Sequence, residues 1–167
     1  MAGELKSTDI KTPTPAEWRA AMGYFPTGVT IVTSWQDGLP VGSTVNAFCS
    51  VSLEPPMLLV CLDRTNPILD PIRHSRVFGV NILDEEAHGL ASHFAKLPET
   101  DRFKVCGYRS VSEGAPQLEA APVFIDCVLE NAHLAGDHFV LIGRGVRTAH
   151  SSTAQPLLYH KGRFHKF

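Results

Sequence analysis

The stretch GSTVNAFCSVSLEPPMLLVCL, residues 42–62, carries two strand-like segments separated by a pair of prolines. The first segment mixes small hydroxyl and amide side chains with apolar ones, whereas MLLVCL over 57–62 is continuously apolar. A short apolar run bounded by turn residues is typical of a fully buried strand, and Pro55-Pro56 marks the turn before it. We therefore predict a strand over 41–51 and a fully buried strand over 57–62.

Further strands and a few helices are predicted on both sides of this stretch. Thr14, Pro15 and Glu17 form a capping box that begins a helix, which Pro26 and Gly28 end. β-branched residues over 28–35 indicate a strand, and Asp37-Gly38 is a hairpin signal. The remaining predicted elements are helices over 67–74 and 85–95, a loop over 97–117, and strands over 77–83, 121–135, 136–149, 156–162 and 163–167.

Strands dominate this pattern and do not alternate regularly with helices. That order argues against a doubly wound parallel sheet and favours a mainly β fold, an antiparallel barrel with short peripheral helices. Residues 1–13 are expected to form a flexible N-terminal tail, and 14–167 a single domain.

The composition excludes several classes of protein. Of the 167 residues 44% are hydrophobic and 19% charged, which is ordinary for a globular domain, and the net charge of −2 predicts neither nucleic-acid nor acidic-membrane binding. No apolar run approaches the roughly 20 residues of a membrane span, and no signal-peptide core is present near the N-terminus. We therefore expect a cytoplasmic protein.

The familiar signatures of hydrolases, phosphate loops and metal sites do not occur. GRG at 143–145 holds only two glycines, and His88 and His93 lie five residues apart, too far to share a helix face well. The four cysteines match no zinc spacing, and Cys49, Cys61 and Cys127 fall in apolar stretches where small buried thiols are expected. No metal site is predicted.

The hydroxyls and the amide within 42–56 suggest a ligand site of a different kind. Alternation puts Thr44 and Asn46 on one strand face, and a bend near Ser50 would turn Ser50 and Ser52 toward the same ligand. Such groups bind a polyol, a heteroaromatic edge or a phosphate without fixed charge. The alternative is a strand with its hydroxyls on a solvated face.

Five stretches in order resemble the short-chain flavin reductase family: YFPTGVTIVTS, GSTVNAFCSVSLEPPMLLVCL, VFGVNIL, GDHFVLIGRGV and PLLYHKGRF. The resemblance covers roughly residues 16–164. TVNAFCSVSLEPP is its most specific element, and GDH is the next. The resemblance implies a Greek-key split β-barrel that binds flavin at a homodimer interface. It also implies an NAD(P)H:flavin oxidoreductase that uses FMN or FAD and supplies reduced flavin to a separate monooxygenase.

The resemblance also implies roles for particular residues. It places His138 near the nicotinamide, where we expect it to position that ring rather than act as an obligatory acid. The expected flavin contacts are Thr44, Val45 and Asn46 along the ring and ribityl chain, Thr27 near the ring, Ser50, Val51 and Ser52 at the phosphate, Arg64 and Thr65 as further phosphate contacts, Tyr159 beside the flavin or the dimer seam, and Phe103 in a mobile cover over 92–103.

Two other functions are compatible with a split barrel. An FMN-binding electron-transfer protein of the same fold would not use nicotinamide. A split-barrel oxidase of a phosphorylated amine would need a cluster of cations that the sequence does not show. As co-substrate we expect NADH slightly more than NADPH, because no arginine pair is clearly placed to bind the 2′-phosphate of NADPH.

Overall fold

The computed structural model describes residues 11–96, 99–110, 113–151 and 153–167. Most of the tail predicted over 1–13 lies outside these residues. Helix α1, Pro15–Met22, begins at the predicted capping box: Thr14 Oγ1 accepts from Glu17 N at 3.3 Å, and Glu17 Oε2 accepts from Thr14 N at 2.8 Å.

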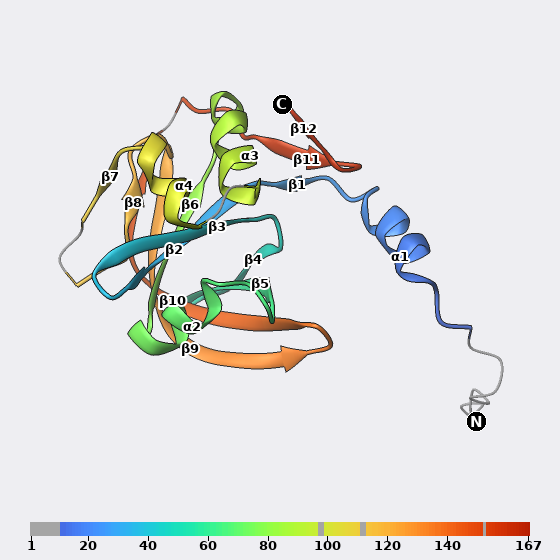
Figure 1. The fold of residues 1–167 in the computed structure, drawn as a ribbon, viewed down its shortest axis with the longest axis horizontal. Helices are drawn as coiled ribbons and strands as arrows, with labels where there is room; N and C mark the ends of the chain where they lie inside the picture. The colour runs from blue at the N-terminus through green and yellow to red at the C-terminus, as the bar shows by residue number, and fades with distance from the viewer. Residues whose placement is uncertain (1–10, 97–98, 111–112, 152) are drawn as a thin grey trace.

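One antiparallel sheet forms most of the body (Figure 1), and its strand order is β3-β2-β6-β9-β10-β5-β4. The end strands β3 and β4 are consecutive in the chain and are joined only by Asn46 and Ala47. The sheet therefore curves until its two edges meet at this link, which gives the predicted split barrel. Its strands are β2 Thr30–Gln36, β3 Leu39–Val45, β4 Phe48–Leu53, β5 Pro56–Asp63, β6 Val77–Ile82, β9 Val123–Ala135 and β10 His138–His150.

Two small sheets and several short helices surround the barrel (Figure 1). One sheet joins β1 Thr27–Gly28, β11 Leu158–His160 and β12 Arg163–His165, and the other joins β7 Tyr108–Arg109 and β8 Gln117–Leu118. The helices are α2 Leu69–Ser75, η1 Glu85–Ala87, α3 His88–Lys96, α4 Glu99–Arg102 and η2 Phe103–Val105. The loop predicted over 97–117 thus contains short elements. None of the helices in the described part of the chain is long and apolar enough to cross a membrane.

Two hydrophobic clusters hold these parts together. The barrel interior contains Val60, Phe78 and Leu141, each fully buried. The second cluster, with Phe94 and Leu157, joins α3 and the C-terminal segment to the barrel. Each such side chain contributes about 1.5–3 kcal/mol by leaving water, so α3 is firmly seated beside β3.

The long hydroxyl-rich segment differs from its predicted form. The strand expected over 41–51 is interrupted at Asn46 and Ala47, and the expected bend near Ser50 is a β-bulge between Ser50 and Ser52. The hairpin turn at Asp37-Gly38 is confirmed, with φ of 52° and 79°.

Burial was predicted wrongly for strand β5 and for two cysteines, and the structure also leaves apolar side chains near α1 uncovered. Strand β5 is only half buried, because one of its faces lines the barrel and the other does not. Cys49 is exposed on the end strand β4 and Cys61 is only half-buried, although Cys127 is buried as expected. Apolar side chains on and just after α1 are uncovered within the described part of this chain: Trp18 is 58% exposed and Phe25 70% exposed.

Candidate functional site

The link between β3 and β4 brings three elements of the fold together. Phe48 N donates to Asn46 O at 3.0 Å, and Cys61 N donates to Ala47 O at 2.9 Å, so β5 holds the link from one side. From the other side, Asn46 Nδ2 donates to Thr27 Oγ1 at 3.3 Å. The barrel edge is thereby connected to the small sheet that contains β1.

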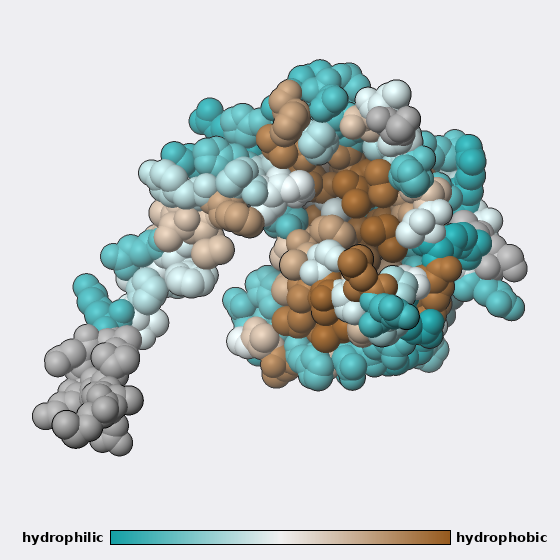
Figure 2. Space-filling view, turned by 180° about the vertical axis from the view of Figure 1, so that it is seen from behind, coloured by the Kyte–Doolittle hydropathy of each residue, from teal (hydrophilic) through white to brown (hydrophobic). Residues whose placement is uncertain are grey.

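A cavity of about 860 Å³ lies beside this link. Its walls come from α1, from residues 24–27 and 46–48, and from the β11–β12 hairpin, and they include Thr27, Asn46, Phe48 and Tyr159. Figure 2 shows hydrophobic residues gathered on the body beside the arm that carries α1. The cavity therefore combines aromatic and apolar surface with a few polar groups, which is typical of a small-molecule site.

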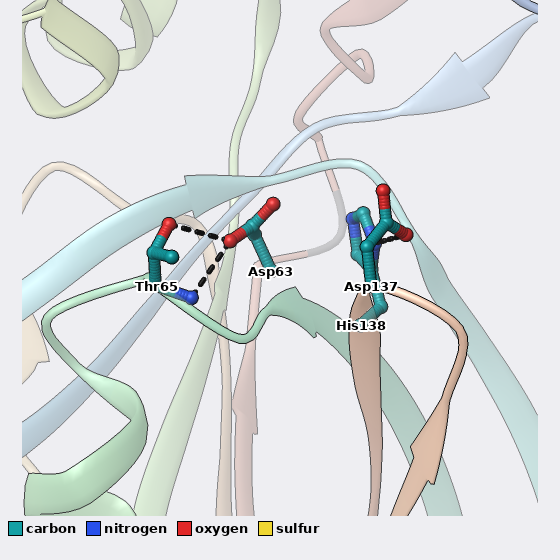
Figure 3. A network of polar contacts seen from close by, with 4 residues as sticks. All are labelled: Asp63, Thr65, Asp137 and His138. Atoms are coloured by element: carbon teal, nitrogen blue, oxygen red, sulfur yellow. Dashed lines mark hydrogen bonds and ion pairs between the residues drawn. The ribbon is translucent and has the colours of Figure 1, made fainter. Parts of the chain in front are cut away.

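A polar cluster lies where β5 ends and β10 begins (Figure 3). Thr65 donates to Asp63 Oδ1 twice, from N at 2.7 Å and from Oγ1 at 2.6 Å. His138 Nδ1 lies 2.7 Å from Asp137 Oδ1, and Arg64 N donates to Asp137 O at 3.0 Å. The turn after β5 is thus tied to the turn that precedes β10.

Both carboxylates of this cluster are held in the ionised form. The side-chain and backbone hydrogen bonds from Thr65, with a smaller effect of the His138 charge, lower the pKa of Asp63. The hydrogen bond with His138 lowers the pKa of Asp137. An ionised carboxylate can only accept, so His138 Nδ1 carries a hydrogen and its Nε2 is the atom left for a ligand.

The structure sorts the expected site residues into three places. Thr27, Asn46 and Tyr159 line the cavity, while Arg64, Thr65 and His138 lie at the polar cluster. Ser50 and Val51 are exposed at the bulge of β4, and Ser52 is partly buried there.

Three expected contacts have side chains that point elsewhere. Thr44 Oγ1 donates to Ala91 O of α3 at 2.7 Å, and Val45 belongs to the barrel core. Thr44 and Asn46 do not continue one strand face, because β3 ends at Val45. Phe103 packs edge-on against Phe94 with ring centroids 5.0 Å apart, in the second core cluster.

The segment expected to form a mobile cover is, in its described part, packed against β3. Arg102 Nη1 donates to Gly42 O at 2.6 Å, and a Cβ at Gly42 would meet the rings of Phe94 and Phe103 at 3.0 and 3.3 Å. A side chain at this position would require the two rings to shift by a few tenths of an ångström.

Some residues of the cavity were not predicted from the sequence. Arg19, Tyr24, Phe48 and Lys161 all line the cavity. The Lys-Gly pair inside PLLYHKGRF resembles a hairpin turn and was the signal available for Lys161. Nothing in the local pattern indicates that this turn lies next to α1.

The polar cluster also has the composition of a metal site. One ligand atom each of Asp63, Asp137 and His138 lies within 4.8 Å of the others. Asp63 Oδ1 already accepts two hydrogen bonds, and His138 Nδ1 is engaged with Asp137. We assign no metal to this cluster.

Comparison with known proteins identifies relatives along nearly the whole chain. The flavin reductase like domain matches residues 22–167. The chain is 36% identical over 150 residues to the flavin-dependent monooxygenase reductase subunit HsaB of Rhodococcus jostii, covering 90% of this chain and 76% of that protein. It is also 36% identical over 163 residues to the reductase component of the 4-nitrophenol 4-monooxygenase/4-nitrocatechol 2-monooxygenase of Rhodococcus opacus, covering 98% of this chain and 86% of the relative.

Solved structures agree with this assignment. The NADH:FAD oxidoreductase SgcE6 of Streptomyces globisporus, in complex with NAD and FAD fragments, superposes with a TM-score of 0.86 at 29% identity, covering 95% of this chain and 97% of that chain. The flavin reductase HpaC complexed with NADP+ gives 0.85 at 32% identity, covering 92% and 98%. On sequence, fold and extent of the match, the chain belongs to the flavin reductase family of oxidoreductases, whose split barrel it adopts.

Proposed function

We propose that this enzyme transfers hydride from reduced nicotinamide to FMN or FAD and passes the reduced flavin to a separate monooxygenase. The observation that carries the proposal is the cavity beside Asn46, whose walls combine aromatic side chains with the hydroxyl and amide groups of Thr27, Asn46 and Tyr159. Relatives named as reductase components of monooxygenases, and neighbours solved with nicotinamide and FAD fragments, support the same reaction class.

The residues around the cavity fit a flavin by their chemistry. Thr27, Asn46 and Tyr159 provide hydroxyl and amide groups for the edge of the ring, and Phe48 provides an apolar surface. Within the described residues β3 is an end strand with one edge not paired to another strand, and we propose that backbone groups of Thr44 and Val45 contact the flavin there.

The bulge of β4 is proposed as the contact for the ribityl phosphate. Ser50, Val51 and Ser52 lie where the register with β5 shifts, and a bulge leaves backbone groups outside the ladder. The donors of Thr65 are already used by Asp63. A phosphate at Thr65 would have to displace a carboxylate, and Arg64 N already donates to Asp137 O at 3.0 Å, so we rank Arg64 and Thr65 below the bulge.

His138 is proposed to orient the nicotinamide. Nicotinamide and flavin supply the redox chemistry: a hydride leaves C4 of the dihydropyridine for N5 of the flavin. The protein must hold the two rings together and keep water out. With Nδ1 of His138 fixed by Asp137, Nε2 is available to contact the nicotinamide carboxamide.

A homodimer is part of the proposal. Within this chain Trp18, Met22 and Phe25 are 58%, 51% and 70% exposed on and just after α1. Large apolar side chains gathered on one helix are typical of a protein interface. A second copy of the chain that covers this face would also close the cavity beside it.

Location in the cytoplasm remains a proposal. The four cysteines are free thiols, which is usual where thioredoxin and glutathione keep thiols reduced.

The direct test is turnover. Purified protein is mixed with NADH or NADPH and with FMN, FAD or riboflavin, and loss of reduced nicotinamide is followed in the absence of oxygen. Flavin-dependent oxidation is expected. Tight FMN binding with no nicotinamide oxidation would instead identify an electron carrier.

A further inference from the structure

The cavity carries two positive charges and no negative one. Among the described residues that line it, Arg19 and Lys161 are the charged side chains, and none is a carboxylate. Six other cations of the described chain pair with carboxylates: Arg73, Lys104, Arg109, Arg144, Arg147 and Lys166. No such pair is found for Arg19 or Lys161 within the described residues. A cavity of this kind attracts anions.

Arg19 and Lys161 lie far apart in the sequence. Backbone hydrogen bonds of Gly23 join the two segments that carry them. Gly23 N donates to Arg19 O at 3.0 Å, and Lys161 N donates to Gly23 O at 3.0 Å. A Cβ at Gly23 would lie 3.3 Å from Arg19 O and 3.6 Å from the Cα of Lys161. The C-terminus of α1 is therefore seated directly on the β11–β12 turn.

Lys161 occupies a position that disfavours lysine. Lys161 and Gly162 form a two-residue hairpin loop with φ of 48° and 78°. Such turns prefer Asn, Asp or Gly at the first position, because other side chains rarely adopt the left-handed region. The hairpin at Asp37-Gly38 has nearly the same angles and follows that preference. A residue kept against local preference at a cavity wall suggests a functional role.

Tyr24 holds the Lys161 side chain in place. The Lys161 ammonium lies 3.8 Å from the centroid of the Tyr24 ring, a cation–π contact that leaves the hydrogens of the ammonium available to acceptors. Lys161 is thus directed by a ring that also lines the cavity.

We propose that Arg19 and Lys161 together bind the phosphate groups of the nucleotide that enters this cavity. The inference rests on the proposed function only for the choice of nucleotide. Two sources share this chemistry. One is the phosphate of FMN, which this site would then hold in place of the β4 bulge, and the other is the diphosphate of the nicotinamide dinucleotide, which leaves the ribityl phosphate at the bulge. A guanidinium and an ammonium are well suited to either, because charge-assisted hydrogen bonds to phosphate are stronger than neutral ones.

The test uses two charge-removing variants and one matched control. Lys161→Asn removes the ammonium and places a residue that suits the turn, so the protein is expected to fold at least as well as the parent. Arg19→Gln keeps a good helix former in α1. Arg163→Gln, an exposed cation two residues beyond Lys161 and absent from the cavity lining, is the control.

Binding is measured with ligands that differ in phosphate. Dissociation constants for FMN and riboflavin come from flavin fluorescence, and Michaelis constants come from NADH and from N-benzyl-dihydronicotinamide, which has no phosphate. For the ligand whose phosphate binds here, FMN or NADH, we expect each single variant to raise the dissociation or Michaelis constant about 3- to 10-fold, and the double variant to raise it further. The constants for the phosphate-free ligands, riboflavin and N-benzyl-dihydronicotinamide, should not change. A loss confined to FMN assigns the site to the flavin phosphate, and a loss confined to NADH assigns it to the dinucleotide.

Three results would overturn the proposal. The variants could bind FMN and NADH as the parent does, they could lose riboflavin as much as FMN, or Arg163→Gln could match Lys161→Asn. Flavin binding needs no turnover, so the two proposals can fail separately. A protein that does not oxidise NADH, but whose Lys161→Asn variant selects less strongly for FMN over riboflavin, retains the phosphate site and loses the reductase function.

Discussion

Asn46 donates a hydrogen bond from Nδ2 to Oγ1 of Thr27 at 3.3 Å, across 19 residues of sequence. Thr27 begins the small sheet and Asn46 links the two end strands of the barrel. The contact thus joins two sheets at the wall of the cavity. Because it is exposed, it contributes little to folding and is free to exchange partners with a ligand.

Replacing Asn46 by alanine is therefore expected to affect the ligand more than the fold. We expect flavin binding to weaken about 3- to 10-fold, because one polar contact to the ring is lost. The midpoint of urea unfolding should move little. Fluorescence titration with FMN measures the first quantity. Thr27→Ser, which keeps the hydroxyl, is the control, and unchanged FMN affinity in Asn46→Ala would remove Asn46 from the site.

His138→Ala should separate the two substrates. The imidazole lies at the polar cluster rather than among the cavity-lining residues, so we expect a higher Michaelis constant for nicotinamide and nearly unchanged flavin affinity. Steady-state kinetics with varied NADH and fixed flavin measure the change. Asp137→Asn should raise the Michaelis constant for nicotinamide less, because it weakens the hydrogen bond that orients the His138 imidazole but leaves the imidazole in place. Normal turnover and normal nicotinamide affinity in His138→Ala would exclude the role.

The Asp63–Thr65 contact should give the protein an acid-sensitive contribution to stability. The folded pKa of Asp63 is lowered, mainly by the Thr65 hydrogen bonds, so the native state binds fewer protons than the unfolded chain. The stabilisation is present above the unfolded pKa of about 3.9 and is lost as pH falls through the lowered folded value. Urea unfolding of Asp63→Asn at a series of pH values should show a weaker acid loss than the parent. Thr65→Val should do the same by removing the hydroxyl donor, and equal acid slopes in all three proteins would contradict this.

Removing Arg147 from its ion pair with Asp126 should lower the free energy of unfolding more than removing the charge of Asp126. Asp126 is 1% exposed and accepts from Arg147 Nη2 at 2.8 Å and from Ala115 N at 3.0 Å. Arg147→Met leaves a buried carboxylate without its counter-ion and should cost about 3 kcal/mol. Asp126→Asn leaves an amide that still accepts from Ala115 and should cost about 1–2 kcal/mol. Chemical unfolding at neutral pH compares them, and equal or reversed costs would contradict the argument.

The exposed face of α1 gives a test of the proposed homodimer. Trp18→Glu puts a charge where we expect a second copy of the chain to pack. The variant dimer should therefore dissociate at a higher protein concentration than the parent dimer. Sedimentation measures the mass across a dilution series. Lys96→Glu, a charge change on a surface position outside the cavity, is the control. An unaltered mass for Trp18→Glu would place the interface elsewhere.

Local sequence determined the parts whose physics is local. The capping box at Thr14, the turn at Asp37-Gly38 and the bulge at Ser50 were predicted from neighbouring residues and are confirmed. Their conformations depend on hydrogen bonds and backbone angles within a few residues. The order of five motifs along the chain likewise identified the family, which the comparisons confirm.

Tertiary structure alone decided which side chains reach the cavity. Thr44 points to α3 because it alternates with Val45, which faces the barrel core, and α3 packs on the opposite face of β3. Lys161 lines the same cavity as Arg19 because the β11–β12 turn bonds to Gly23. Alternation along a strand predicts faces only while the strand continues, and neighbours across a closed sheet are set by long-range pairing that no short window of sequence contains.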